Sequence, residues 1–330
     1  MIVMNNLQKS IIRILQEKKE CSRKELSSLL SVTPAAVTLA TAYLLEKGFI
    51  SKLHEVTRDS AGRKEIMLAV NPDSFFSVGI DIHDDGFSLI RINGMLEIIQ
   101  DVEMSTKKEL FDVLSVMDFS NSVGVSICLK SFYRIDHVSD DVKELIAFIK
   151  NLTTNVTIKN NIAALAYAYK MFNPQDANFA LIKYGPGLGS AFFIDNRLLQ
   201  NQSSPTYELG KMLLDNSSLT IEEQIGYNRI ASSKQEAVST IKNDALLQNK
   251  ILKTIGLAIY NVNTLLQLDK VLVSGDIFKD DSIFASLLRE IPMSEEEKTK
   301  VTRMNNYPEL NKIKTALTAQ YLFLSSENKE

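Results

Sequence analysis

Hydrophobic and polar positions alternate with a helical period at the start of the chain. Leu7, Ile11, Ile14 and Leu15 fall on one face and predict a first helix. Residues 22–48 read SRKELSSLLSVTPAAVTLATAYLLEKG and predict two further helices joined by a tight turn. Three helices in this order are typical of a helix-turn-helix domain, in which the last helix enters a DNA groove.

Polar residues mark the predicted helix ends. Ser22 and Glu25 have the spacing of a capping box, in which each side chain bonds a free backbone amide. Thr33 is a good N-cap, and Pro34 fits the first helical position, where a missing N–H costs nothing. Gly48 predicts the end of the third helix.

The third helix begins with small or hydroxylated side chains, which suit a helix that lies close to base edges. We therefore predict two groups of DNA contacts. Base edges are expected to face Thr33, Ala35, Ala36, Thr38 and Thr41, and phosphates to contact Ser22, Arg23 and Lys24.

Two strand-like runs, 49–53 and 65–70, follow around a glycine-containing loop and predict a β-hairpin. Three helices and a hairpin form a winged helix-turn-helix. The hairpin tip brings Arg58, Arg63 and Lys64 toward the phosphate backbone, and Arg63 can also reach a narrow minor groove. A helical hairpin packed onto another domain is the alternative, which the flanking elements disfavour.

After residue 71 the pattern changes to strands that alternate with helices, as in an α/β fold. Strands are predicted at 76–82, 87–92, 95–100, 123–128, 156–159, 179–184, 190–194 and 270–274, with a hairpin turn at Asn93-Gly94. Helices are predicted near 107–117, 140–151, 161–172, 219–226, 233–243, 247–267, 281–289 and 310–325. The two halves have the same order of elements, so we interpret them as related versions of one unit.

Charge is distributed unevenly. The chain of 330 residues has a formal net charge of −3. Residues 1–70 contain eleven Lys and Arg against seven Asp and Glu, a net of +4, which leaves −7 for the rest. A basic N-terminal segment of residues 1–70, called the head, followed by an acidic remainder, called the body, is typical of a DNA-binding domain attached to another domain.

The residues that bind metals or form disulfides are few. Two cysteines and three histidines occur in no metal-ligand spacing, so we expect no metal, no cofactor and no disulfide framework. The first residues do not resemble a signal peptide, and no apolar run approaches the roughly 18 residues of a membrane helix. We therefore expect a cytoplasmic protein without a membrane partner.

Motifs in order along nearly the whole chain resemble the ROK family, which groups sugar-responsive repressors with sugar kinases. The predicted β-hairpin, or wing, resembles that of the repressor branch. The matching segments are Ala61-Gly-Arg-Lys64, Gly79-Ile-Asp81 (first phosphate loop), Lys159-Asn-Asn161 (the Glu-Asn-Asp motif), Gly185-Pro-Gly-Leu-Gly189 (second phosphate loop), Glu208-Leu-Gly-Lys211 (Glu-Leu-Gly-His) and Val273-Ser-Gly-Asp276.

The resemblance implies an α/β body of two actin/hexokinase-like (ribonuclease H-like) lobes behind the winged helix. The expected domains are a DNA-binding domain at 1–70, a first lobe at 71–158 and a second lobe at 159–309. The helix at about 310–325 is expected to return to the first lobe.

Several positions depart from the kinase pattern. Asn161 stands where the kinases have their catalytic aspartate, and an amide cannot accept a proton near neutral pH. His83-Asp84-Asp85 sets negative charges near the expected phosphates, and Pro186 lacks a backbone donor. Lys211 replaces a histidine of the family's zinc site, and the cysteine-rich segment is missing. We therefore predict that the body is not an enzyme.

The resemblance implies a pocket for a sugar or sugar-phosphate effector. The matching positions are Asn160, Asn161, Glu208 and Glu222, and Lys211 adds a cation that favours an anionic ligand. Amides and carboxylates suit hydroxyl groups because they pair adjacent donors and acceptors. The alternative is that these residues are helix caps and surface polar groups.

Together these patterns predict a DNA-binding transcriptional regulator, a repressor of carbohydrate-related genes, that binds a double-stranded operator as a homodimer or higher homo-oligomer. Two alternatives remain. One is an active ROK-type sugar kinase with an accessory N-terminal domain. The other is a DNA-binding protein whose body only oligomerises.

Overall fold

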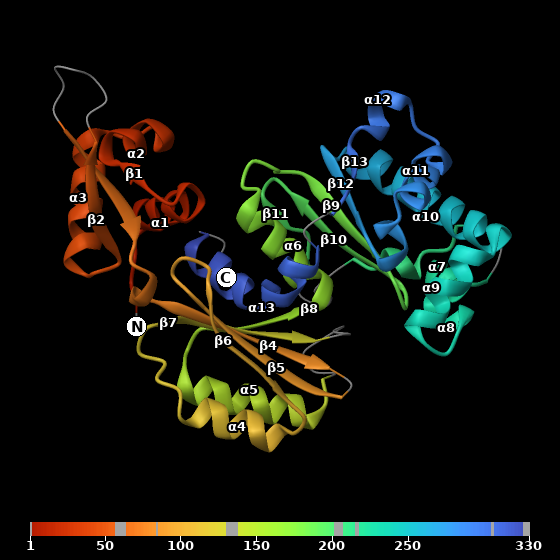
Figure 1. Cartoon of the computed structure of the whole chain (residues 1–330), viewed down its shortest axis with the longest axis horizontal. Helices are drawn as coiled ribbons and strands as arrows, with labels where there is room; N and C mark the ends of the chain where they lie inside the picture. The colour runs from red at the N-terminus through yellow and green to blue at the C-terminus, as the bar shows by residue number, and fades with distance from the viewer. Residues whose placement is uncertain are drawn as a thin grey trace. The chain divides into compact units, whose positions relative to one another are not determined.

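The computed structural model describes residues 2–56, 64–83, 85–129, 138–200, 207–214, 218–304 and 307–325. The chain divides into two compact units (Figure 1). One unit comprises Met1–Ser131, Asp136–Phe172 and Lys312–Glu330, and the other Phe132–Ile135 and Asn173–Asn311.

The first unit begins with a winged helix. Its elements are α1 (Asn6–Lys18), β1 (Cys21–Ser22), α2 (Arg23–Leu30), α3 (Pro34–Glu46), β2 (Ile50–Val56) and β3 (Glu65–Val70). The strands form an antiparallel sheet in the order β1-β3-β2. The chain bends by 119° between α2 and α3, within the range of helix-turn-helix motifs. Strand β1 was not predicted, because two residues carry no alternating pattern.

The core of the winged helix continues into the body. Ile11, Leu26 and Leu44 from its three helices belong to the same buried cluster as Phe75 and Leu324. The DNA-binding head therefore shares a hydrophobic core with the lobe that follows it, and the two form one compact unit.

A five-stranded sheet forms the lobe of the first unit. Its strands are β4 (Phe76–His83), β5 (Gly86–Asn93), β6 (Ile98–Met104), β7 (Ser122–Leu129) and β8 (Val156–Asn160), in the order β6-β5-β4-β7-β8. Helices α4 (Lys107–Ser115) and α5 (Asp140–Leu152) cover one face, and α13 (Tyr307–Leu324) lies on the other (Figure 1). Helix α6 (Asn161–Phe172) follows β8, and η1 (Pro72–Ser74) precedes β4.

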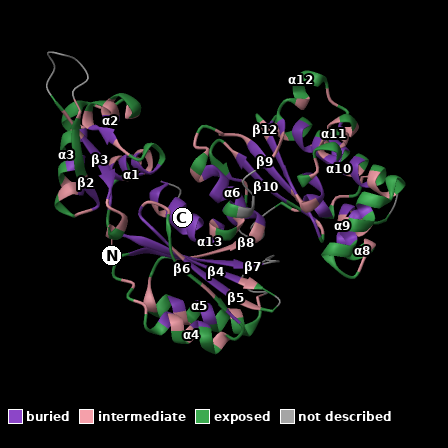
Figure 2. Cartoon of the chain, in the orientation of Figure 1, coloured by how far each residue is buried: buried purple, intermediate pink, exposed green. Residues whose placement is uncertain are grey.

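The second unit repeats this sheet. Strands β9 (Phe179–Tyr184), β10 (Leu188–Ile194), β11 (Arg197–Leu198), β12 (Lys270–Ser274) and β13 (Val301–Arg303) lie in the order β11-β10-β9-β12-β13. In both sheets the first three strands are antiparallel, and the fourth and fifth run parallel to the first. The buried residues follow the central strands of each sheet (Figure 2). The prediction of two related α/β units is confirmed.

Helices of the second unit pack against its sheet. They are α7 (Ile221–Ile225), α8 (Tyr227–Ile230), α9 (Lys234–Asn243), α10 (Ala245–Leu266), α11 (Asp281–Glu290) and α12 (Glu295–Lys298), with short 3₁₀ turns η3 (Leu209–Lys211) and η4 (Asp276–Lys279). Isoleucines from α7, α9 and α10 belong to one buried cluster with residues of β9 and β12.

Two sequence predictions differ from the structure. The second lobe does not begin at residue 159, because α6 packs with β7 and β8 in the first unit. The turn after β5 is also longer than the predicted Asn93-Gly94 hairpin, so β6 begins at Ile98. The Asn93 side chain accepts hydrogen bonds from the backbone amides of Met95 and Glu97, which holds the four intervening residues out of the ladder.

Single membrane-spanning helices and metal clusters are both absent from the described ranges. No single helix there is long and apolar enough to cross a membrane. The same residues contain no group of three or more His, Cys, Asp or Glu side chains arranged to hold a metal ion.

Candidate functional site

The helix starts of the head are capped as predicted. The backbone amide of Glu25 donates to the Ser22 hydroxyl at 3.3 Å, and the amide of Ser22 donates to the Glu25 carboxylate at 2.8 Å. Thr33 accepts a hydrogen bond from the amide of Ala36, with Pro34 at the first helical position. These caps fix where α2 and α3 begin, and so which side chains of α3 face outward.

One face of α3 is exposed to solvent. Ala35, Thr38, Leu39 and Ala42 lie on it at the spacing of successive helical turns. Leu39 is 74% exposed. Leu39 and Ala42 are not among the predicted DNA contacts, although their spacing from Ala35 already places them on the same face.

Two predicted DNA contacts are buried instead. The Thr41 hydroxyl donates to the carbonyl of Val37 at 2.8 Å and accepts from the guanidinium of Arg23. The Ser22 hydroxyl donates to the carboxylate of Glu65 at 2.6 Å. Both hydroxyls serve internal contacts of the head, so the assignments of Ser22 and Thr41 to DNA are wrong.

Two of the predicted phosphate contacts, Lys24 and Lys64, are exposed lysines that pair with glutamates. The side chain of Lys24 is 83% exposed and lies 3.4 Å from Glu65, and that of Lys64 is 67% exposed and lies 3.2 Å from Glu55. Such exposed pairs contribute little, so both lysines stay available to an anion. Arg58 and Arg63 lie outside the described residues, as does Asp84.

A second candidate site lies on the second unit, beside the turn that joins β9 to β10. Gly187 in this turn and Gly210 in η3 both lie against the carboxylate of Glu222. A Cβ atom on Gly187 would meet that carboxylate at 2.7 Å, and one on Gly210 at 3.1 Å. The glycines therefore give the carboxylate close access to the backbone.

Glu208, Lys211 and Glu222 gather at this place. The ammonium of Lys211 donates a hydrogen bond to the Glu222 carboxylate. Burial raises the pKa of Glu208, the Glu222 charge adds to this, and Lys211 opposes it. Glu222 compensates the charge of Lys211, so Lys211 does not favour an anionic ligand as predicted.

Asn160 and Asn161 lie on the first unit, at the junction of β8 and α6. The Asn160 side chain accepts a hydrogen bond from the amide of Ala163 at 2.8 Å, so it caps the helix. The side-chain oxygen of Asn161 is buried and has no hydrogen-bond partner among the described residues. An unpaired buried carbonyl costs free energy, so this oxygen is suited to a ligand donor.

The first unit also contains a buried ion pair that the sequence did not reveal. Asp81, at the expected first phosphate loop, accepts a hydrogen bond from the ammonium of Lys314 at 2.9 Å. The hydroxyl of Thr315 donates to both carboxylate oxygens, at 2.9 and 2.8 Å. Helix α13, which carries both Lys314 and Thr315, therefore holds Asp81. Burial and the adjacent Asp81 charge raise the pKa of the Cys128 thiol, which keeps this thiol protonated.

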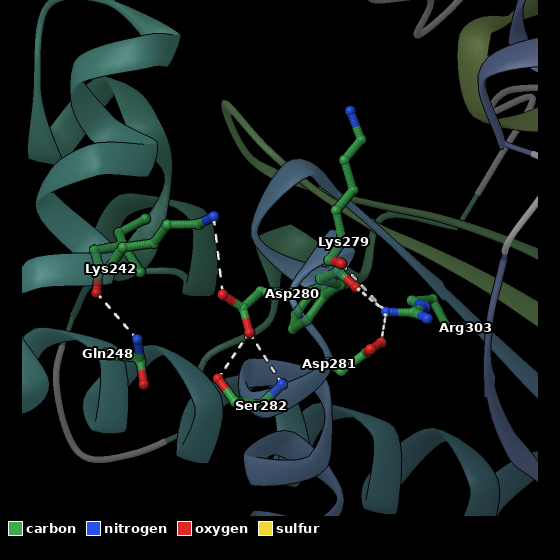
Figure 3. A network of polar contacts seen from close by, with 9 residues as sticks. Lys242, Gln248, Lys279, Asp280, Asp281, Ser282 and Arg303 are labelled. Atoms are coloured by element: carbon green, nitrogen blue, oxygen red, sulfur yellow. Dashed lines mark hydrogen bonds and ion pairs between the residues drawn. The ribbon is translucent and has the colours of Figure 1, made fainter.

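The turn after β12 is fixed by charged contacts of its own (Figure 3). Asp280 caps α11 by accepting hydrogen bonds from the Ser282 amide and hydroxyl, at 2.9 and 2.7 Å. Arg303 pairs with Asp281 at 2.6 Å and donates to the carbonyl of Phe278 at 3.1 Å.

Asp276, which begins η4 in the same turn, also has internal partners. Burial alone would raise the pKa of this carboxyl, yet hydrogen bonds from Lys234 and Lys279 hold it below its usual value. The charges of this turn are thus matched within the second unit.

Known proteins resemble this chain at two levels. Residues 4–57 match the MarR family. The xylose repressor of Bacillus subtilis is 24% identical over 234 residues, which are 63% of this chain and span 60% of the length of that repressor.

Solved structures resemble the chain more completely. A ROK family transcriptional regulator, described as a homologue of the E. coli MLC protein, superposes with a TM-score of 0.73 at 19% identity, covering 97% of this chain and 98% of that one. A ROK hexokinase from Thermus thermophilus has a TM-score of 0.58 at 13% identity, covering 74% of this chain and 98% of that one.

These likenesses confirm the predicted fold class. The chain has an N-terminal winged helix followed by an α/β body with the fold of ROK regulators and sugar kinases. Its sequence is similar to those of xylose repressors over about two thirds of the chain. The resemblance to the ROK family, predicted from short motifs, is confirmed.

Proposed function

We propose that the protein is a DNA-binding transcriptional regulator, a repressor of carbohydrate-related genes, whose kinase-like body senses a sugar or sugar phosphate. One observation carries this proposal: the head and the lobe share polar contacts through α1 and α13. The side-chain amide of Gln16 donates to the carbonyl of Gly94 at 2.7 Å and to Gln320 at 3.0 Å. The Gln320 amide donates to the carbonyl of Asn93 at 2.8 Å.

Helix α13 links these contacts to the interior of the lobe. Phe323 lies under the ammonium of Lys9, with the nitrogen 5.0 Å from the ring centre. In its middle α13 carries Lys314 and Thr315, which hold the buried Asp81. A ligand-dependent change in the lobe that moves α13 therefore reaches the DNA-binding head directly.

The body acts as a sensor and not as a kinase. Asn161 cannot take a proton from a sugar hydroxyl. Asp81 is occupied by Lys314 and Thr315, which leaves it unable to serve an incoming nucleotide without breaking a buried ion pair. Pro186 offers no backbone donor, and the carboxylate of Glu222, paired with Lys211, lies against the neighbouring Gly187.

Each unit has its own candidate hydroxyl-binding groups for the effector. Those of the first unit are Asn160 and Asn161, and those of the second are Glu208 and Glu222, with Lys211 orienting Glu222. The protein acts in the cytoplasm as a homodimer or higher homo-oligomer, because one winged head reads too few base pairs for useful specificity. The same proposal includes two groups of DNA contacts. Phosphates or the minor groove are contacted by Arg23, Lys24, Arg58, Arg63 and Lys64, and base edges by Thr33, Ala35, Ala36 and Thr38.

The test uses the full chain and a pool of random duplexes. Repeated selection should enrich a pseudo-palindromic site, and a specific sugar or sugar phosphate should change the affinity for that site. In a thermal-shift screen of the same panel, only the effector should raise the unfolding midpoint of the protein. Enrichment of a site without any response to the panel would favour a body that only oligomerises. Turnover in a coupled ATPase assay with any sugar would favour the kinase.

A further inference from the structure

Helix α3 is apolar on both of its sides. Its inner side buries Val37, Ala40 and Leu44 in the core of the head. Its outer side carries Ala35, Thr38, Leu39 and Ala42, all exposed. Residues 34–46, PAAVTLATAYLLE, contain one charged side chain, at the last position. Such a helix is normally covered on both sides, so the outer side is suited to a partner.

The outer side also lacks free hydrogen-bond donors. Alanine and leucine side chains have none. The Thr38 hydroxyl donates to the carbonyl of Pro34 at 2.8 Å, so its single donor is occupied. These four side chains therefore do not read guanine or adenine edges by donating hydrogen bonds. What they offer to a DNA groove is a set of methyl groups.

The surroundings of this face favour DNA over an apolar protein surface. Lys24, at the start of the preceding helix, projects an exposed ammonium group. Ser31 and Thr33 are exposed in the turn between α2 and α3. One exposed ammonium group and two exposed hydroxyl groups on the neighbouring segments suit phosphates, and thymine is the base that presents a methyl group in the major groove.

We propose that the outer side of α3 reads thymine methyl groups, and that Leu39 determines specificity by packing on one of them. This inference rests on the proposed DNA-binding function. Leu39 has the longest reach of the four side chains, and its 74% exposure leaves most of its surface free for the base. Burial of one methyl group accounts for about a fourfold change in affinity.

The test begins with the duplex enriched by selection from a random pool. Each thymine is replaced in turn by deoxyuridine, which removes the C5 methyl and keeps the base pairing. Affinity is measured by fluorescence anisotropy with the full chain. We expect about a fourfold loss at one or more thymines of each half-site. Equal affinity for every substituted duplex would overturn the proposal, while binding of the selected duplex would leave the proposed function in place.

A variant then assigns the methyl contact to Leu39. Leu39→Ala should weaken binding to the thymine duplex and lose the effect of deoxyuridine at one position, because the two changes remove the same contact. Alanine favours helix formation, so the variant should fold. Leu246→Ala is the control, since Leu246 is 86% exposed but lies in the second unit.

Other outcomes of this variant contradict the inference. If Leu39→Ala keeps the full effect at every position, Leu39 is not the reader. If it dissociates the oligomer without changing intrinsic affinity for DNA, the face is a subunit interface. Failure of the parent chain to enrich any duplex at low salt would instead refute the proposed function itself.

Discussion

Gln16 in the DNA-binding head donates a hydrogen bond of 3.0 Å to Gln320, 304 residues further along the chain. Both side chains are buried. Each also donates to a backbone carbonyl at the end of β5, Gln16 to that of Gly94 and Gln320 to that of Asn93. Two amides thus join the head, the sheet and the last helix of the first unit. A buried amide that loses its partner costs more free energy than the bond itself contributes.

Gln320→Ala should therefore destabilise the first unit by about 1–3 kcal/mol, because it removes the buried side-chain donor to the carbonyl of Asn93 and leaves Gln16 without one acceptor. Urea unfolding followed by circular dichroism measures the change. Gln248→Ala is a suitable control, since Gln248 makes a single, partly buried bond to the carbonyl of Ile241. Equal losses for the two variants would contradict a special role for the Gln16–Gln320 contact.

Lys314→Met should cost about 3–5 kcal/mol, because it removes the cation that compensates a buried carboxylate. The double variant Asp81→Leu with Lys314→Met should recover most of this loss, since buried ion pairs are often replaceable by apolar residues. Denaturant midpoints give both values.

Lys312→Met provides the control for the Lys314 series. Lys312 lies on the same helix and pairs with Asp101, but its side chain is 53% exposed. Its loss should cost at most about 1 kcal/mol. A double variant less stable than Lys314→Met alone would show that the pair contributes more than charge compensation.

Local signals in the sequence predicted the elements well. The capping residues Ser22 and Thr33 set the helix starts, and the strands of both sheets followed from apolar runs. The burial of Thr41 was also readable, because it lies four residues after Val37 on the inner side of the helix. The small and hydroxylated side chains of this helix also suit a DNA-facing surface, and residue type alone therefore predicted the wrong side for Thr41.

Other features had no local signal. The contact of Asp81 with Lys314 spans 233 residues, and no pattern near either residue announces it. The strands β11 and β13 have two and three residues, too few for a period. The pairing of Lys211 with Glu222 depends on how η3 and α7 pack, which spacing along the chain does not determine.

Glu208→Gln should raise the thermal midpoint near neutral pH. Burial raises the pKa of Glu208 in the folded protein, so its ionisation opposes folding. This cost is present above the raised pKa and disappears as the pH falls to the ordinary carboxyl pKa of about 4.3, where the group is protonated in both states. The gain from glutamine should therefore shrink on acidification. Differential scanning calorimetry across this pH range measures it.

Glu17→Gln controls for the loss of one negative charge, because Glu17 is exposed on α1. A gain that is the same for both variants, or one that grows as the pH falls, would contradict the burial of Glu208. Solvent reaches part of the Glu208 side chain, so we expect a small shift rather than a large one.

Asn161→Asp restores the carboxylate of the kinase motif and should still yield no kinase. Asp81 remains held by Lys314 and Thr315, and Pro186 still lacks a donor. One restored base therefore does not rebuild the site. A coupled assay with ATP and a panel of sugars, with an active hexokinase as positive control, measures turnover. Turnover in this variant or in the parent would contradict the reading of the body as a sensor.

The same variant should change the response to the effector. The Asn161 side chain offers both an amide donor and a buried oxygen without a partner among the described residues, whereas a carboxylate offers only acceptors. A ligand hydroxyl that accepts from the amide would lose that bond and face a negative charge. We therefore expect weaker effector binding in thermal-shift titrations and an altered release from DNA. An unchanged response would remove Asn161 from the effector site and leave the absence of kinase activity untouched.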